Sequence, residues 1–74
     1  MSQRVQIRLD TQSDVAEFVN IANTINEPVY LVDNKECKVN GKSLMGCLYS
    51  LEFNQLYVES DYQNLSNKFN KFLV

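Results

Sequence analysis

Histidine is absent from this 74-residue sequence, and cysteine, glycine and proline are scarce, with two, two and one copies. Without an imidazole, Cys37 and Cys47 have no neutral-pH base to activate them. They also cannot complete a closed zinc shell without help from carboxylates. We expect both thiols to be buried and to act as small hydrophobic residues. Two glycines, Gly41 and Gly46, are too few for a glycine-rich phosphate loop. We therefore expect no catalytic site, no metal and no cofactor.

The charge pattern and the hydrophobic pattern exclude two further classes of partner. The formal net charge is −2, and lysine and arginine form no cluster, so we expect no nucleic-acid partner. No apolar run approaches the roughly 20 residues that span a bilayer, so we expect no membrane segment. The first residues, 1–4, lead directly into an alternating pattern rather than a signal-like stretch. The sequence predicts one cytoplasmic domain over residues 1–74.

The first half of the chain predicts a strand, a helix and a hairpin. Apolar residues alternate with polar ones over 5–9, which is typical of a half-buried strand. Apolar residues at helical spacing predict a helix over 14–25, which the single proline terminates. Two short runs at 29–32 and 37–39 flank a turn at 33–35 and indicate an antiparallel hairpin.

The second half predicts a helix, a strand and a final helix. Helical spacing follows Ser43 and ends near 50 or 51, and alternation predicts a strand over 56–59. Ser60 and Gln63 fit a capping box before a helix that runs to the C-terminus. This order favours an α+β fold with three helices on one face of a four-stranded, mainly antiparallel sheet. The expected core comprises Val5, Ile7, Leu9, Val15, Phe18, Val19, Ala22, Ile25, Val29, Leu31, Cys37, Val39, Leu44, Cys47, Leu48, Leu51, Leu56, Val58, Leu65, Phe69, Phe72 and Leu73.

The stretch from 39 to 48 joins a strand to a helix and contains the main candidate site. Asn40 and Gly41 form a strong turn signal, because both tolerate a positive φ. Ser43 follows at the expected N-cap position, and Met45 falls off the apolar helix face. Two interpretations of Ser43 stay open. It is either a plain N-cap, worth about 1 kcal/mol, or a regulated phosphorylation site.

The run Gly41-Lys42-Ser43-Leu44-Met45-Gly46 resembles the helix-opening motif of HPr, the small phosphocarrier of the bacterial sugar phosphotransferase system. HPr proteins have the same order of elements, so the resemblance implies an HPr-like open-faced sandwich of order βαββαβα. It also implies that Ser43 is a regulatory phosphoserine. The family's other landmark is a histidine followed by Ala-Arg-Pro, and this histidine carries the phosphoryl group. The present chain has no histidine.

A gap-free alignment from this motif places Gln12 at the family's histidine and Asp14 at its arginine. Glutamine cannot carry a phosphoryl group, and Asp14 repels one. Some HPr-like proteins have glutamine here, keep the serine and act as corepressors in catabolite control. The family's arginine helps to bind the kinase and the transcription-factor partner, so an acid at this position argues against the same partners.

The resemblance thus implies a non-catalytic regulatory or protein-binding module. Its expected partner is a kinase, a transcription factor or another phosphotransferase component, and its expected docking residues are Gln12, Lys42, Leu44, Met45 and Leu48.

Three alternatives remain. One is a phosphotransferase component of the phosphocarrier type that uses a shifted site. Another is a diverged domain that has lost both phosphorylation roles and binds through its tyrosines or dimerises. The third is acid–base chemistry by the carboxylates Asp10, Asp14 and Glu17, for which helix capping with a solvated face is the competing interpretation.

Overall fold

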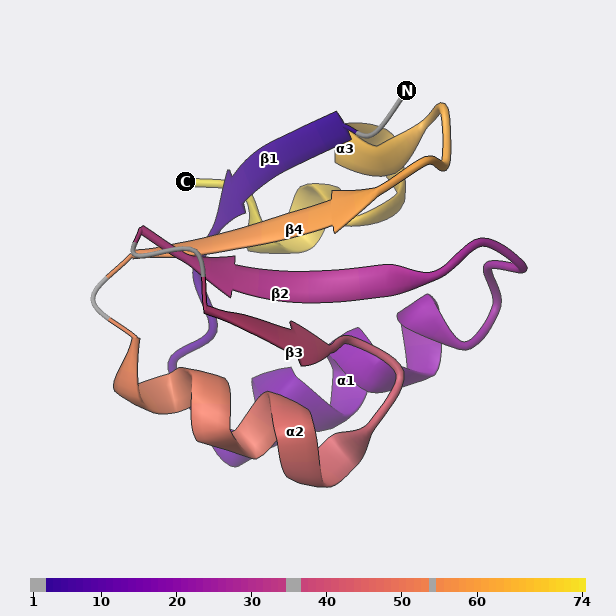
Figure 1. Ribbon diagram of the computed structural model, residues 1–74. Coiled ribbons are helices and arrows are strands. Elements are labelled where there is room, and N and C mark those ends of the chain that lie inside the picture. The colour runs from indigo at the N-terminus through magenta and orange to yellow at the C-terminus, as the bar shows by residue number, and fades with distance from the viewer. Residues whose placement is uncertain (1–2, 35–36, 54) are drawn as a thin grey trace.

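The fold is a four-stranded antiparallel sheet covered on one face by helices (Figure 1). The computed structural model describes residues 3–34, 37–53 and 55–74. Lys35 in the predicted turn and Asn54 lie outside the described residues. The predicted fold class and order of elements are confirmed. In chain order the elements are β1 (Gln3–Ile7), α1 (Gln12–Ala22), β2 (Val29–Asp33), β3 (Lys38–Asn40), α2 (Leu44–Tyr49), η1 (Ser50–Glu52), β4 (Leu56–Ser60), α3 (Leu65–Lys68) and η2 (Asn70–Phe72).

The strand order in the sheet is β1-β4-β2-β3, so β4 lies between β1 and β2. Each neighbouring pair is antiparallel. Val58 lies opposite both Val5 and Leu31, and Leu31 lies opposite Val39. Because side chains alternate between the faces of a strand, this register places these four residues on one face. That face is covered by the helices, and the other face is open.

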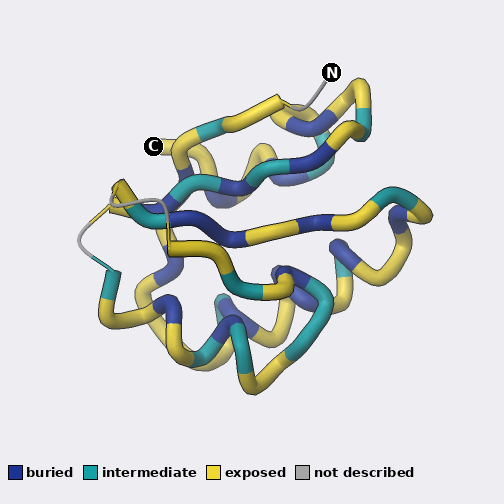
Figure 2. Tube along the Cα trace, viewed as in Figure 1, coloured by how far each residue is buried: buried dark blue, intermediate teal, exposed yellow. Residues whose placement is uncertain are grey.

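The core lies between the sheet and the helices, as the buried segments in Figure 2 show. Its centre is Phe18 of α1, whose ring stacks on Phe69 at 4.7 Å and meets Phe72 at 6.0 Å. Most of the predicted core is buried. Four predicted core residues are instead exposed, and the prediction was wrong for Cys37, Leu44, Leu51 and Leu73. Val5, Val39 and Leu48 are partly buried against the core.

Val32 is fully buried, although it lies on the open face of the sheet. Side chains alternate along β2, so Val32 and its neighbour Leu31 point to different faces. Its neighbours across the sheet are Lys38 and Tyr57. Long side chains on adjacent strands cover a short β-branched one between them. Burial of Val32 therefore does not require a second layer of helices.

The predicted capping box at Ser60 and the long final helix are both wrong. Ser60 ends β4, and its hydroxyl donates to the Pro28 carbonyl at 2.8 Å and accepts from the Tyr62 amide at 3.2 Å. The hydroxyl is therefore used in a turn, and α3 begins five residues later without a side-chain cap. After α3 the chain tightens into η2 and forms a β-bridge between Leu73 and Ile7. Pairing with β1 satisfies backbone groups that a longer helix would have used.

Candidate functional site

The turn before α2 is held by three hydrogen bonds that backbone amides donate. The Gly41 amide donates to the Val29 carbonyl at 2.7 Å, and the Lys42 amide donates to the Asn40 side-chain oxygen at 2.9 Å. The Ser43 amide donates to the Asn40 carbonyl at 3.1 Å. Gly41 does not have the positive φ that we expected. A glycine is needed because a Cβ there would lie 2.9 Å from both the Val29 carbonyl oxygen and its Cγ1 atom.

Ser43 is the N-cap of α2, as predicted. Its backbone is extended, and its hydroxyl accepts a hydrogen bond from the Gly46 amide at 3.3 Å. Its carbonyl accepts from the Cys47 amide at 2.9 Å, which closes the first helical turn. The residue is half-buried. The hydroxyl oxygen thus has a structural role, whether or not it is also modified.

Lys42 and Asn23 attach this turn to the end of α1. The Lys42 ammonium group donates to the Ile25 carbonyl, and the Asn23 side-chain amide donates to the Lys42 carbonyl at 3.3 Å. The same amide also donates to the Val19 carbonyl at 2.9 Å. The ammonium group is therefore engaged by the segment that follows α1.

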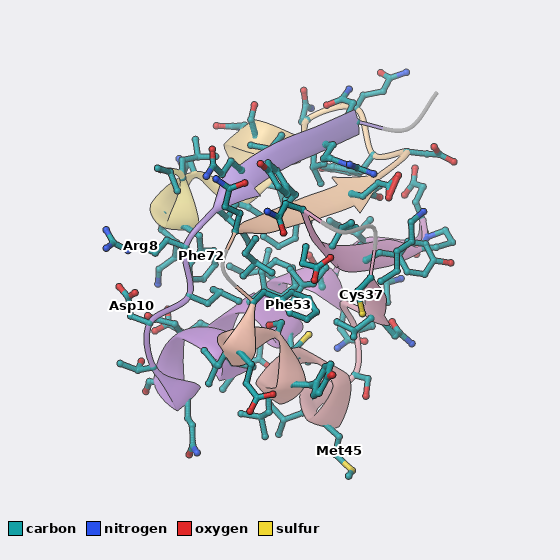
Figure 3. The ribbon with its side chains drawn as sticks, turned by 60° about the vertical axis from the view of Figure 1, so that its left-hand side comes forward. Arg8, Asp10, Cys37, Met45, Phe53 and Phe72 are labelled. Carbon is teal, nitrogen blue, oxygen red and sulfur yellow. The ribbon has the colours of Figure 1, made fainter. Side chains whose placement is uncertain are left out.

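Beyond Ser43, α2 presents apolar side chains to solvent. Met45 is 84% exposed, Tyr49 56% and Leu44 49%, and Leu48 is half-buried. We call these four residues the α2 surface. In Figure 3 Met45 projects from α2 away from the rest of the molecule. Tyr49 also meets the Phe53 ring edge-on at 5.9 Å. A single charged residue, Glu52, occurs between 43 and 53. Exposed apolar residues gathered on one element indicate an interaction site.

The structure does not bring Gln12 together with Ser43. Gln12 is the first residue of α1 and is exposed, whereas the turn at Ser43 contacts the last turn of that helix. Eleven helical residues span about 16 Å. Helices α1 and α2 pack side by side and run in opposite directions (Figure 1). Of the predicted docking residues, Lys42, Leu44, Met45 and Leu48 lie together, and Gln12 lies at the far end.

Asp14 and Thr11 form a capping box at the start of α1, which begins two residues before the predicted start. The Thr11 hydroxyl accepts from the Asp14 amide at 3.1 Å. The Asp14 carboxylate accepts from the amides of Thr11 at 3.3 Å and Asp10 at 3.0 Å. This geometry supports the capping interpretation of the acidic residues, because the Asp14 carboxylate already accepts two backbone bonds.

The two cysteines have opposite environments. Cys37 is exposed, and Cys47 is fully buried beneath the turn, with its thiol 3.4 Å from the Gly41 carbonyl oxygen. Burial raises the pKa of the Cys47 thiol from 9.0 to about 11. Among the described residues, no group of three or more Cys, Asp or Glu side chains could hold a metal ion.

We predict that iodoacetamide at pH 8 alkylates Cys37 in the folded protein and leaves Cys47 unmodified. At that pH a pKa near 11 leaves about one Cys47 thiol in a thousand as the reactive thiolate. Peptide mass mapping after timed labelling measures both sites, and labelling in urea is the control that makes both react. Equal rates at the two sites in the folded protein would contradict this arrangement.

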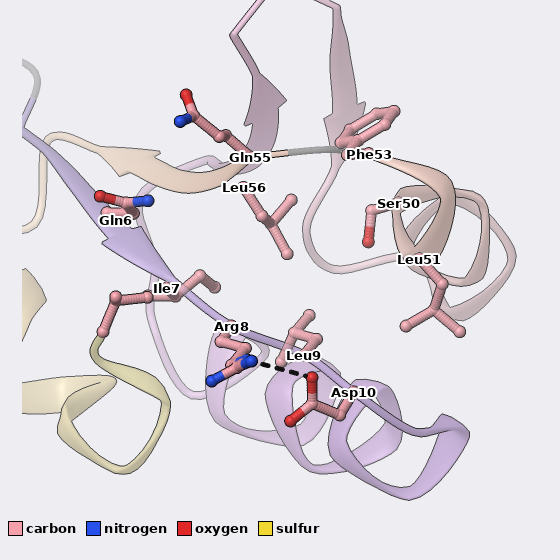
Figure 4. Close-up of a pocket in the computed structure, with 11 residues that line it drawn as sticks. Gln6, Ile7, Arg8, Leu9, Asp10, Ser50, Leu51, Phe53, Gln55 and Leu56 are labelled. Carbon is pink, nitrogen blue, oxygen red and sulfur yellow. Dashed lines mark ion pairs between the residues drawn. The ribbon is translucent and has the colours of Figure 1, made fainter.

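One further feature, which no sequence pattern predicted, is a cleft of about 500 Å³ beside the segment from β1 to α1 (Figure 4). Its other walls come from the chain after α2 and from the start of β4. These segments are far apart in the sequence, so no local pattern marks the cleft.

Within the described part of the chain, no helix is long and apolar enough to cross a membrane.

Comparisons with known proteins find similarity at the level of structure. No protein-family profile matches the sequence, and no curated protein matches it. Among solved structures, the crystal structure of the phosphocarrier protein HPr from Bacillus anthracis strain Ames superposes with a TM-score of 0.62 at 22% identity. The match covers 96% of this chain and 89% of the HPr chain. The chain therefore has an HPr-like fold.

Proposed function

We propose that this chain is a non-catalytic protein-binding module, related to the phosphotransferase system, that docks through the α2 surface. The observation that supports this proposal best is the exposure of Leu44, Met45 and Tyr49 on one short helix. An interface core that is apolar and almost free of charge is typical of protein partners. Because its contacts are apolar, we expect binding to depend little on salt.

The start of α1 argues against histidine-type phosphotransfer. A glutamine, Gln12, begins the helix, and the Asp14 carboxylate adds negative charge within its first turn. No histidine occurs anywhere in the chain to accept a phosphoryl group. We therefore propose that the chain is neither an enzyme nor a phosphocarrier.

Phosphorylation of Ser43 is the proposed means of regulation. A phosphoserine carries nearly two negative charges at pH 7, and the amides at the start of a helix favour an anion there. The charge would lie directly beside Leu44 and Met45 and so change the docking surface. Lys42 neutralises it only after releasing the Ile25 carbonyl, which it contacts in the unmodified protein.

Intact mass after two incubations tests this proposal. One reaction contains ATP and the serine kinase that modifies HPr, and the other contains phosphoenolpyruvate and the general enzyme that charges HPr. We expect one added phosphate with ATP only, absent in Ser43→Ala and retained in Ser66→Ala, which removes an exposed serine hydroxyl on α3. Loss of the cap in Ser43→Ala costs about 1 kcal/mol, so urea unfolding must show that this variant is folded. Phosphate acquired from phosphoenolpyruvate would refute the non-carrier assignment.

The docking role of α2 is tested by Met45→Asp in the same kinase assay. We expect the rate of modification to fall at least about tenfold, the effect of losing roughly 1.4 kcal/mol at an interface. The free energy of unfolding should change by less than about 0.5 kcal/mol, because Met45 is exposed. Asn34→Asp introduces the same charge at an exposed turn and is the control. An unchanged rate in Met45→Asp removes α2 from the interface.

A further inference from the structure

The cleft beside β1 has an apolar floor. Ile7, Leu9 and Leu56 form it, and each is at most 8% exposed, so the apolar surface that a ligand can still cover comes mainly from Leu51, which is 36% exposed, and from the half-buried Phe53. The buried Ser50 also lines it, and its hydroxyl already donates to the Cys47 carbonyl. Leu51 of η1 forms one wall, opposite the β1–α1 segment (Figure 4). A volume of about 500 Å³ is within the range of small-molecule sites.

Arg8 and Asp10 are the lining residues with charged side chains, and the last residue, Val74, also lines the cleft. Arg8 and Asp10 form an ion pair with 3.3 Å between Nε and Oδ1 (Figure 4). Their side chains are 74% and 66% exposed, so the pair contributes little to stability and exchanges readily for other partners. Their backbones are fixed, because the Arg8 amide donates to the Phe72 carbonyl at 2.8 Å and the Asp10 amide to the Asp14 carboxylate at 3.0 Å.

We propose that this cleft binds a zwitterionic α-amino acid with an aliphatic side chain. The carboxylate of the ligand pairs with the Arg8 guanidinium group, its ammonium group pairs with the Asp10 carboxylate, and its side chain packs against Leu51 and Phe53. A simple anion is attracted by Arg8 and repelled by Asp10. A simple cation is attracted by Asp10 and repelled by Arg8. A zwitterion matches both charges at once, and the accessible apolar surface of Leu51 and Phe53 favours an aliphatic side chain over glycine.

Titration with L-leucine, followed by ¹H–¹⁵N correlation spectra of the whole chain, tests the proposal. We expect saturable shifts at the amides of the cleft, with a dissociation constant on the order of 1 mM, as suits a ligand of few heavy atoms. Glycine lacks the side chain, 4-methylpentanoate lacks the ammonium group and leucinamide lacks the carboxylate. Each should bind at least about fivefold more weakly.

Variants at the rim assign the contacts. Arg8→Gln and Asp10→Asn should each weaken L-leucine binding at least about fivefold and leave the fold intact, because both side chains are exposed. Lys68→Gln, outside the cleft lining, is the control and should bind as the parent does. The proposal is overturned by the absence of saturable shifts, by equal binding of 4-methylpentanoate or glycine, or by full binding in both rim variants.

Discussion

Replacing Phe18 by alanine is expected to remove most of the free energy of unfolding at 25 °C. Phe18 is fully buried and lies between α1 and the C-terminal segment, in ring contact with Phe69 and Phe72. Truncating a buried phenylalanine costs about 3–5 kcal/mol. A domain this small has a free energy of unfolding on the order of 5 kcal/mol. The loss therefore removes most of the stability.

Urea unfolding followed by circular dichroism measures this effect. Phe18→Leu keeps much of the buried volume, so it should remain folded with a lower midpoint and show that the site tolerates substitution. Met45→Ala removes a side chain that is 84% exposed and should change the free energy of unfolding by less than about 0.5 kcal/mol. A Phe18→Ala variant that loses less than about 1 kcal/mol would show that the stacked rings are not the centre of the core.

Gly41→Ala is expected to lower the free energy of unfolding by about 1–3 kcal/mol, the usual cost of adding a methyl group to a filled site. The added Cβ would lie 2.9 Å from the Val29 carbonyl oxygen. That oxygen also accepts the Gly41 amide at 2.7 Å, so the two backbones cannot separate without losing this bond. Movement of the turn also shifts Ser43, two residues later, so the cap of α2 weakens with it.

Gly46→Ala is the matched control for the same chemical change. A Cβ at Gly46 meets its nearest atom, the Asn40 carbonyl oxygen, at 3.4 Å, and the position lies within α2. Alanine favours a helix interior over glycine by about 1 kcal/mol. We therefore expect Gly46→Ala to be neutral or stabilising in the urea experiment. If the two variants unfold at the same midpoint, close packing against Val29 is not the reason for a glycine at position 41.

The sequence determined the order of the elements and most of the buried residues. A spacing of two between apolar residues predicts a strand, and spacings of three and four predict a helix. These spacings are local properties of the chain, and each element buries its apolar side. Ser43 was recognised as an N-cap for the same reason, because a cap satisfies amides within one turn. The element limits were less accurate. β1 ends at Ile7 because its partner β4 begins opposite it at Leu56, and α1 begins at Gln12 because the Thr11–Asp14 capping box satisfies amides at the start of the helix.

Only the tertiary structure decided which apolar residues stay exposed and where the cleft lies. Leu44 on α2 and Leu51 on η1 have core spacing, yet both are exposed, and Cys47 is the buried residue of α2. Val32 is buried by neighbours across the sheet, and Leu73 pairs with β1 instead of extending a helix. The charged pair at Arg8 and Asp10 lines the cleft together with residues forty or more positions away in the chain. These outcomes depend on contacts between distant segments, which a local pattern does not encode.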